Sequence, residues 1–235
     1  FYVDKIYIMK VVNDGEFTII EDVLPKESVD GFENIIIPHL KYSIGENYKG
    51  TSGISNDYFR KLGIENIYEQ FQFYCLSFSN SDRDFQKENY HLLTLPLTLA
   101  CLGIGLCYTF DQIIRIKANI QTQAPKKFKG YYNEPHTDLS IEELRIYENS
   151  FTAIYYVNDS DGDTFFFEGT GGDTHILNNE EIIQKYNNLN IKKIVSPKQN
   201  KMVIFPSHIL HSGSHPINST LRSVINYNFL AFNIK

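Results

Sequence analysis

Hydrophobic runs separated by polar turns dominate the second half of the chain, from about Gln112 onward. The runs are rich in β-branched and aromatic residues, and Gly, Asn, Asp and Pro fill the intervals between them. Several short strands joined by such turns are typical of a sandwich or a closed barrel. The expected strands are 112–120, 151–157, 164–168, 191–195, 201–205 and 222–232, with one helix near 179–187.

The first half of the chain has a mixed pattern. Residues 16–24 and 68–78 resemble strands. A helix is expected over residues 25–38, where apolar residues recur at helical spacing and a proline stands at each end. Residues 91–107 form a second helix candidate, and residues 45–65 resemble a loop with a short helix.

No linker or internal repeat divides the 235 residues, and a domain commonly has about 100–200 residues. We therefore expect a single domain over residues 1–235, mainly β with some α. In this prediction residues 1–110 form a mixed, partly helical layer. That layer supports a β barrel made by residues 111–235.

One apolar segment raises the question of a membrane span. Residues 91–110 contain no Asp, Glu, Lys or Arg, and their length would suffice to cross a bilayer. However, the segment contains Pro96, Gly103 and Gly105, and no cluster of basic residues follows it to fix an orientation. We therefore expect a buried helix and no membrane association. The opening FYVDKIYIMK has no long apolar stretch, so no signal peptide is expected.

Charge and cysteine content narrow the expected partners and compartment. With 22 basic and 28 acidic residues the formal net charge is −6, which argues against nucleic-acid binding, since that depends on clustered Lys and Arg. The three cysteines, Cys75, Cys101 and Cys107, form no close pair, so free thiols in a reducing compartment are expected. A cytoplasmic location follows, which would be the host cytoplasm if a virus encodes the protein. The oligomeric state stays open.

Candidate chemistry is concentrated in three polar features of the second half. His136 and Asp138 lie two residues apart, so both side chains would point the same way on a strand. His208 and His211 follow an apolar strand, and Arg222 lies in a strongly strand-like segment. Two histidines and one carboxylate can form a facial triad that leaves metal positions open, a geometry that suits non-haem Fe(II) and oxygen chemistry.

The order of these motifs resembles that of the 2-oxoglutarate- and iron(II)-dependent oxygenases. The segments HTD, IYYVN, DGDTFFF, KMVIFPSHILHSG and LRSVINYNF follow one another as in the prolyl-hydroxylase-like branch, which includes oxygenases of phages and marine microbes. The resemblance covers about half of the chain, from Arg115 to Phe232. It implies a double-stranded β-helix, which is a jelly-roll barrel, and dependence on Fe(II), 2-oxoglutarate and O2.

The resemblance also implies a metal-binding role for three residues. His136, Asp138 and His211 would hold the iron, and His208 is the alternative to His211. Because Asp138 keeps the carboxylate that halogenating relatives lack, hydroxylation is favoured over halogenation.

Further residues would bind the cosubstrate. Arg222 would pair with the distal carboxylate of 2-oxoglutarate, because a planar guanidinium neutralises a buried carboxylate with two parallel hydrogen bonds. Tyr156 matches a tyrosine that donates its hydroxyl to the same carboxylate. Asn226 and Asn228 share the face of Arg222 by the two-residue period of a strand, and Asn119 is a candidate for the other end of the cosubstrate.

The sequence departs from the family pattern at three places. Ser223 follows the arginine directly, so the frequent Arg-x-Ser pair is absent, and Gly162 stands alone where many members have two glycines. The segment 121–135 is longer than the usual turn, and its Tyr131 or Tyr132 is a candidate for a lid over the site.

The substrate stays open at this level. Resemblance favours a prolyl or other residue of a peptide, and a free small molecule such as an amino acid is the alternative. An alkylated nucleobase is disfavoured by the acidic balance and by the lack of a basic segment interleaved with aromatic residues. The non-enzymatic alternative is a catalytically inactive barrel that acts as a binding module.

Overall fold

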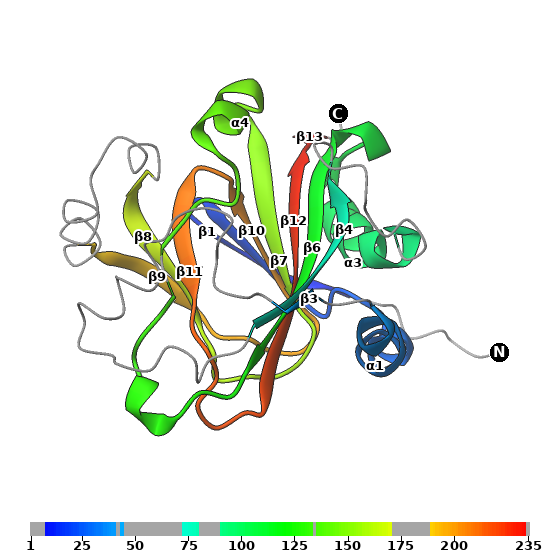
Figure 1. The fold of residues 1–235 in the computed structure, drawn as a ribbon. Helices are drawn as coiled ribbons and strands as arrows, with labels where there is room; N and C mark the ends of the chain where they lie inside the picture. The colour runs from blue at the N-terminus through cyan, green and yellow to red at the C-terminus, as the bar shows by residue number, and fades with distance from the viewer. Residues whose placement is uncertain are drawn as a thin grey trace.

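Two β-sheets face each other and form the body of the molecule (Figure 1). The computed structural model describes residues 8–40, 43–44, 72–79, 90–133, 135–170 and 189–233. The strands of the two sheets are β1 Lys10–Asp14, β2 Phe17–Glu21, β3 Ser43–Ile44, β4 Gln72–Ser79, β6 Ile113–Thr122, β7 Ser150–Tyr156, β8 Thr164–Thr170, β9 Ile191–Val195, β10 Lys201–Pro206, β11 Ile209–Gly213 and β12 Leu221–Leu230. The larger sheet has the order β1-β2-β10-β7-β12-β6-β4-β3, and the smaller sheet has the order β11-β8-β9.

The chain alternates between the two sheets as it builds them. β6, β7, β10 and β12 belong to the larger sheet, whereas β8, β9 and β11 belong to the smaller one. These strands pair in antiparallel fashion, and an isolated bridge between His136 and His211 places the segment before β7 beside β11. The arrangement is a double-stranded β-helix, so the predicted fold class is confirmed.

Side chains of the larger sheet alternate between two apolar cores. On β12, Ile225 and Tyr227 pack with the helices, whereas Val224 packs against the smaller sheet. The face that β6 and β12 turn toward the smaller sheet is different, because it is mostly polar. Its polar residues are Arg115, Lys117, Asn119 and Gln121 on β6, and Arg222, Asn226 and Asn228 on β12.

Helices cover the outer face of the larger sheet (Figure 1). α1 (Lys26–Gly31) continues into a π-helical turn (Phe32–Ile36) and a 3₁₀ turn (Ile37–His39). This succession agrees with the helix expected between the two prolines. α3 spans Tyr90–Gly103 and packs its buried side chains on the same face.

α3 is shorter than the sequence predicted. The helix expected over residues 91–107 ends at Gly103, and Gly105 has a φ of +73°, a conformation that glycine adopts without steric cost. The chain then enters β5 (Leu106–Cys107), which pairs with β13 (Phe232–Asn233) near the C-terminus. The absence of charged residues therefore did not mark the end of the helix, because the short strand β5 that follows is also apolar and uncharged.

Two further expectations concern the apolar segment and the cysteines. Within the described parts of the chain, no helix is long and apolar enough to cross a membrane. Cys101 in α3 and Cys107 in β5 are both free thiols, and burial raises the pKa of Cys101 to about 12.

The N-terminal part supplies strands as well as helices. β2 lies beside β10 and carries β1 at its outer edge, while β4 lies beside β6 and carries β3. The strands expected at 16–24 and 68–78 are found as β2 and β4, whereas β1 and α4 (Ile141–Ile146) were not expected. The helices expected within 45–65 and near 179–187 lie outside the described residues.

Candidate metal and cosubstrate site

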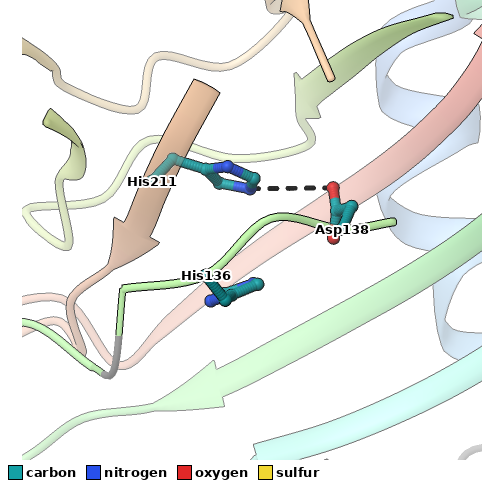
Figure 2. A group of neighbouring side chains, drawn as sticks. All are labelled: His136, Asp138 and His211. Carbon is teal, nitrogen blue, oxygen red and sulfur yellow. Dashed lines mark ion pairs between the residues drawn. The ribbon is translucent and has the colours of Figure 1, made fainter. Parts of the chain in front are cut away.

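Three candidate ligand side chains meet between the two sheets (Figure 2). His211 belongs to β11, and His136 and Asp138 belong to the segment that bridges to it. The amide of His136 donates to the carbonyl of His211 over 2.9 Å, and the amide of His211 donates back to the carbonyl of His136 over 3.0 Å. This reciprocal pair fixes the register, so one ligand atom of each side chain lies within 4.8 Å of the others.

His211 turns one ring nitrogen toward Asp138. Its Nδ1 lies 3.1 Å from the carbonyl oxygen of Ile209, which can only accept, so Nδ1 donates and Nε2 is the nitrogen that faces Asp138. Nε2 is buried without a hydrogen-bond partner and lies 3.6 Å from Asp138 Oδ2 (Figure 2). His208 is exposed and lies outside this cluster, so the geometry favours His211 as the ligand.

Asp138 is held by two side chains of the larger sheet. Arg115 donates from Nη2 to Oδ1 over 2.7 Å, and Asn228 donates from Nδ2 to Oδ2 over 3.4 Å. Arg115 also donates from Nε to Asn228 Oδ1 over 3.0 Å, which closes a ring of three side chains. Burial would raise the pKa of Asp138, but Arg115 and the histidines hold it well below its usual range. The carboxylate is therefore ionised at neutral pH, with Oδ2 facing His211.

This donor set fits a divalent transition metal. Two imidazole nitrogens and one carboxylate oxygen are the ligands of the facial triad of non-haem iron enzymes. Ligand atoms about 2.1 Å from one ion and at right angles lie roughly 3 Å apart, so the Nε2–Oδ2 separation of 3.6 Å needs only a small adjustment. His136 is exposed, and its ring centroid lies 5.0 Å from that of His211.

A buried arginine lies in the same space between the sheets. Arg222 is 5% exposed and donates to the carbonyl of Gly162, to Gln121 Oε1 and to Thr164 Oγ1 over 2.7, 2.7 and 2.8 Å. All three acceptors are uncharged, and burial lowers the pKa of Arg222. These bonds use three of the five N–H donors of a guanidinium, so two donors remain for an anion.

Tyr156 and two glycines shape the surroundings of Arg222. Tyr156 is fully buried, donates its hydroxyl to Thr164 Oγ1 over 2.8 Å, and has its ring centroid 5.9 Å from Arg222 Cζ. Burial raises the pKa of Tyr156 to about 12, so its hydroxyl stays protonated. A Cβ at Gly162 would lie 2.9 Å from Arg222 Cδ, and one at Gly213 would lie 3.2 Å from Nη1. At Gly162 only glycine permits this close approach, because a Cβ there would also lie 2.7 Å from the backbone oxygen of Ser214.

The three asparagines named from the sequence lie on the polar face of β6 and β12. Asn119 is buried, and Asn226 has an Oδ1 that is buried without a hydrogen-bond partner. Asn228 is fully buried, and its amide contacts Asp138 and Thr152. Asn228 therefore lies at the end of the site where the candidate metal ligands meet, away from Arg222.

Sequence reasoning missed four residues of this site. Arg115, Lys117 and Gln121 share one face of β6 with Asn119, and Thr164 begins β8. A signal was present for the first three, because polar residues at every second position of IIRIKANIQT mark a polar strand face. Thr164 carries no such signal, since the fold brings it to Arg222 from the opposite sheet.

In the segment 121–135, the ring contacts of Tyr132 show which way this side chain points. The ring of Tyr132 packs against Phe165 and Phe167, with centroid distances of 5.2 and 4.9 Å. Phe165 lies on the face of β8 opposite to Phe166, which pairs with His211. Tyr132 is thus turned away from the metal ligands in this structure, and a lid formed by Tyr131 or Tyr132 stays a prediction.

Comparisons with known proteins bear on the whole arrangement. Residues 123–230 match the family model described as the 2OG-Fe(II) oxygenase superfamily. None of the curated proteins compared with the chain matches it. The non-heme alpha ketoglutarate dependent epimerase SnoN from nogalamycin biosynthesis is similar in structure, with a TM-score of 0.52 and 12% identity over 92% of this chain and 77% of that chain. SnoN in complex with Fe3+, alpha ketoglutarate and nogalamycin RO has the same TM-score and identity, over 94% and 82%.

A prolyl-4-hydroxylase of Pseudomonas putida is more distant, with a TM-score of 0.36 and 13% identity over 86% of this chain and 96% of that chain. At such identities the likeness to solved structures concerns the fold alone. The family match is what confirms the resemblance inferred from the motif order, because residues 123–230 contain the two histidines, the aspartate and the arginine of that motif. Residues 123–230, just under half of the chain, therefore match the 2OG-Fe(II) oxygenase superfamily.

Proposed function

We propose that the protein is a hydroxylase that couples oxidation of a substrate C–H bond to conversion of 2-oxoglutarate and O2 into succinate and CO2. The observation that carries this proposal is the presence of two complementary sites in one barrel. His136, Asp138 and His211 offer a facial set of metal ligands, and Arg222 offers a buried positive charge among uncharged acceptors. A cosubstrate with a chelating keto acid at one end and a carboxylate at the other needs both.

In this proposal His136, Asp138 and His211 hold Fe(II), which supplies the activation of O2 when it is bound. Three protein ligands leave up to three positions of an octahedral ion for cosubstrate and O2. Arg115 keeps Asp138 ionised and turns Oδ2 toward His211, as the 2.7 Å contact to Oδ1 indicates.

Arg222 binds the distal carboxylate of 2-oxoglutarate through its two remaining N–H donors. Thr164 accepts hydrogen bonds from both Arg222 and Tyr156, so its own hydroxyl hydrogen can be donated to the same carboxylate. Tyr156 then acts by orienting Thr164. Asn119 and Asn226 lie farther along the same face, toward the metal, and are candidates for contact with the rest of the cosubstrate.

We further propose that residues 1–235 form one oxygenase domain, because strands from both sides of residue 110 share the larger sheet. The prolyl-hydroxylase-like motif order favours a residue in a peptide as substrate. A small molecule is the alternative, for which SnoN, an enzyme of nogalamycin biosynthesis, is a precedent. A nucleic-acid substrate is not expected.

Succinate formation from 2-oxoglutarate tests this proposal. The purified protein, supplied with Fe(II), O2 and a panel of prolyl peptides and free amino acids, should form succinate only when iron is present. His211→Ala should abolish the reaction, whereas His208→Ala, the matched control, should retain it. If the parent forms no more succinate than His211→Ala under any condition, including slow turnover without substrate, the hydroxylase proposal fails and the inactive barrel becomes the better interpretation.

A further inference from the structure

The outward side of α3 carries a stripe of leucines at spacings of three, four and three residues: Leu92, Leu95, Leu99 and Leu102. Residues three and four apart lie on one side of a helix. Leu92, Leu95 and Leu102 are 48%, 39% and 58% exposed, and Leu99 is partly exposed. α3 covers the outer face of the larger sheet, on the side away from the smaller sheet (Figure 1). The leucine stripe therefore has no part in the proposed site between the sheets.

Two further apolar side chains extend the leucine stripe. Phe110 is 60% exposed, and its ring centroid lies 5.9 Å from that of His91 at the start of α3. Ile8 is 74% exposed and precedes Met9, whose sulfur lies beside Gly103 at the end of α3. At roughly 150–250 Å² for a whole large side chain, the exposed parts of the stripe and of these two residues amount to about 500 Å².

That area is what one partner of a homodimer needs. An interface of standard size buries about 800 Å² on each partner, and in homodimers about 65% of it is apolar. Scattered exposed residues need no explanation, whereas an apolar patch of several hundred Å² is often an interaction site.

The charge distribution favours a second copy of this chain as the partner. Residues 90–110 contain no Asp, Glu, Lys or Arg, so the whole formal net charge of −6 belongs to the rest of the chain. A helix that lies in a membrane surface carries Lys and Arg on its polar face, and α3 carries neither. A charged peptide would find no charge to recognise here, whereas a second copy presents the same uncharged surface.

The spacing of the leucine stripe is palindromic. Positions 92 and 102 lie equally far from position 97, as do positions 95 and 99. At 3.6 residues per turn, all four leucines centre on the side of the helix opposite Leu97, which is fully buried. A two-fold axis at this level, perpendicular to α3, would bring Leu92 against the partner's Leu102 and Leu95 against the partner's Leu99.

Such an arrangement meets the requirement of a two-fold interface, in which one surface must be complementary to itself. Leucines that recur at three- and four-residue steps interdigitate between paired helices. The same axis would bring the end of the patch with Phe110 toward the partner's other end, where Ile8 lies.

We propose that the leucine stripe of α3 is a homodimer interface, in which two copies of the helix pack antiparallel about a two-fold axis at the level of residue 97. The inference does not rest on the proposed function, because the stripe and the site between the sheets lie on opposite faces of the larger sheet.

Sedimentation velocity of the full chain over a range of concentrations tests this interface. The variants are Leu92→Glu, Leu102→Lys and the double variant, and Ile146→Glu, at an exposed isoleucine of α4, is the matched control. An acidic residue near the start of a helix and a basic residue near its end are favoured by the helix dipole, so both substitutions suit the folded monomer. Circular dichroism checks that each variant is folded.

The parent and the control should sediment as a dimer of twice 27.2 kDa. Each single substitution should raise the Kd of the dimer by at least about 100-fold, because the two-fold axis places the new charge against a leucine twice. The double variant, and an equimolar mixture of the two single variants, should recover the dimer to within about tenfold of the parent. In both cases an introduced carboxylate faces an introduced ammonium across the interface.

The proposal is overturned if the parent is a monomer at every concentration, or if both single variants dimerise as the parent does. Loss of the dimer in the single variants without recovery in the double variant and the mixture would overturn the antiparallel pairing. Flotation with phosphatidylcholine vesicles tests the other occupant. Binding of a monomeric parent to these vesicles, abolished by Leu92→Glu, would assign the stripe to a lipid surface and overturn the proposal.

Discussion

Replacement of Arg222 by alanine should weaken 2-oxoglutarate binding by at least about 100-fold. Arg222 is 5% exposed, and its three hydrogen bonds go to uncharged oxygens at 2.7–2.8 Å. Asp163 acts on the guanidinium only coulombically, so the cosubstrate would supply the one carboxylate that hydrogen-bonds to it. Loss of one partner of a buried charge pair costs about 3–5 kcal/mol. At about 1.4 kcal/mol per tenfold change in affinity, this range corresponds to a loss of about 100-fold or more.

Conservative variants test the geometry of the interaction as well as its charge. Arg222→Lys should rescue only part of the affinity, because an ammonium lacks the planar fork that binds both carboxylate oxygens. Thr164→Val should cost about tenfold, since it removes one hydroxyl donor to the carboxylate. Tyr156→Phe should cost at most about as much, because its hydroxyl contacts Thr164 and acts through it.

Titration calorimetry of the Ni(II)-loaded, O2-free protein measures these affinities, with His208→Ala as the matched exposed control. Metal affinity should be the same in all Arg222 variants, because none of the contacts of Arg222 involves His136, Asp138 or His211. If Arg222→Ala binds 2-oxoglutarate within about threefold of the parent, Arg222 does not bind the distal carboxylate and the cosubstrate assignment is wrong.

Three further perturbations probe the supports of the site. Arg115→Met should weaken Ni(II) binding by about tenfold, since the carboxylate of Asp138 loses a charge-assisted hydrogen bond. Competition with a chelator measures the Ni(II) affinity, and an unchanged affinity would show that Arg115 does not position Asp138. Gly162→Ala should lower the free energy of unfolding by about 1–3 kcal/mol, because its Cβ would lie 2.7 Å from the backbone oxygen of Ser214 and 2.9 Å from Arg222 Cδ. Gly31→Ala, with open space around it, should not lower it, and equal denaturation midpoints would contradict this. Burial would raise the pKa of Asp161, but backbone hydrogen bonds from the loop before β12 lower this pKa below its ordinary value of 3.8. The ionised carboxylate therefore stabilises the fold at pH values above 3.8, and this stabilisation is lost as the pH falls below that value. Asp161→Asn should flatten that acid limb of a denaturation series, and an unchanged limb would refute the assignment.

The sequence predicted the barrel because its strands carry their own signals. Segments such as 151–157 and 191–195 are short, β-branched and bounded by turn residues, and the structure has strands there. The order of HTD, FPSHILHSG and LRSV gave the family, since those residues serve a reaction and not a local structure. The reciprocal bridge between His136 and His211 then shows how residues so far apart in the sequence meet.

Other features depend on contacts that no local pattern specifies. β11 holds His211 but was anticipated only as a strand end, because its five residues include serine, histidine and glycine. The end of α3 depended on Gly103 and Gly105, whereas apolar composition alone suggested a longer helix. The hydrogen bond from Arg222 to Thr164 joins two sheets, and only the closed barrel brings those strands together.

The polar face of β6 could be predicted from the sequence only in part. Alternation of Arg115, Lys117, Asn119 and Gln121 is visible in the sequence, yet either face of an amphipathic strand can be the one exposed to solvent. Pairing with β12 and the contact of Arg115 with Asp138 resolve this choice in favour of the barrel interior.

Iron binding by the two histidine variants tests the metal centre most directly. The parent and His208→Ala should each bind one equivalent of Fe(II) under anaerobic conditions, because His208 is exposed and lies outside the ligand cluster. His211→Ala should lose that binding, since it removes the buried Nε2 that faces Asp138. Loss of iron in His208→Ala with full retention in His211→Ala would contradict the proposed triad and the mechanism built on it.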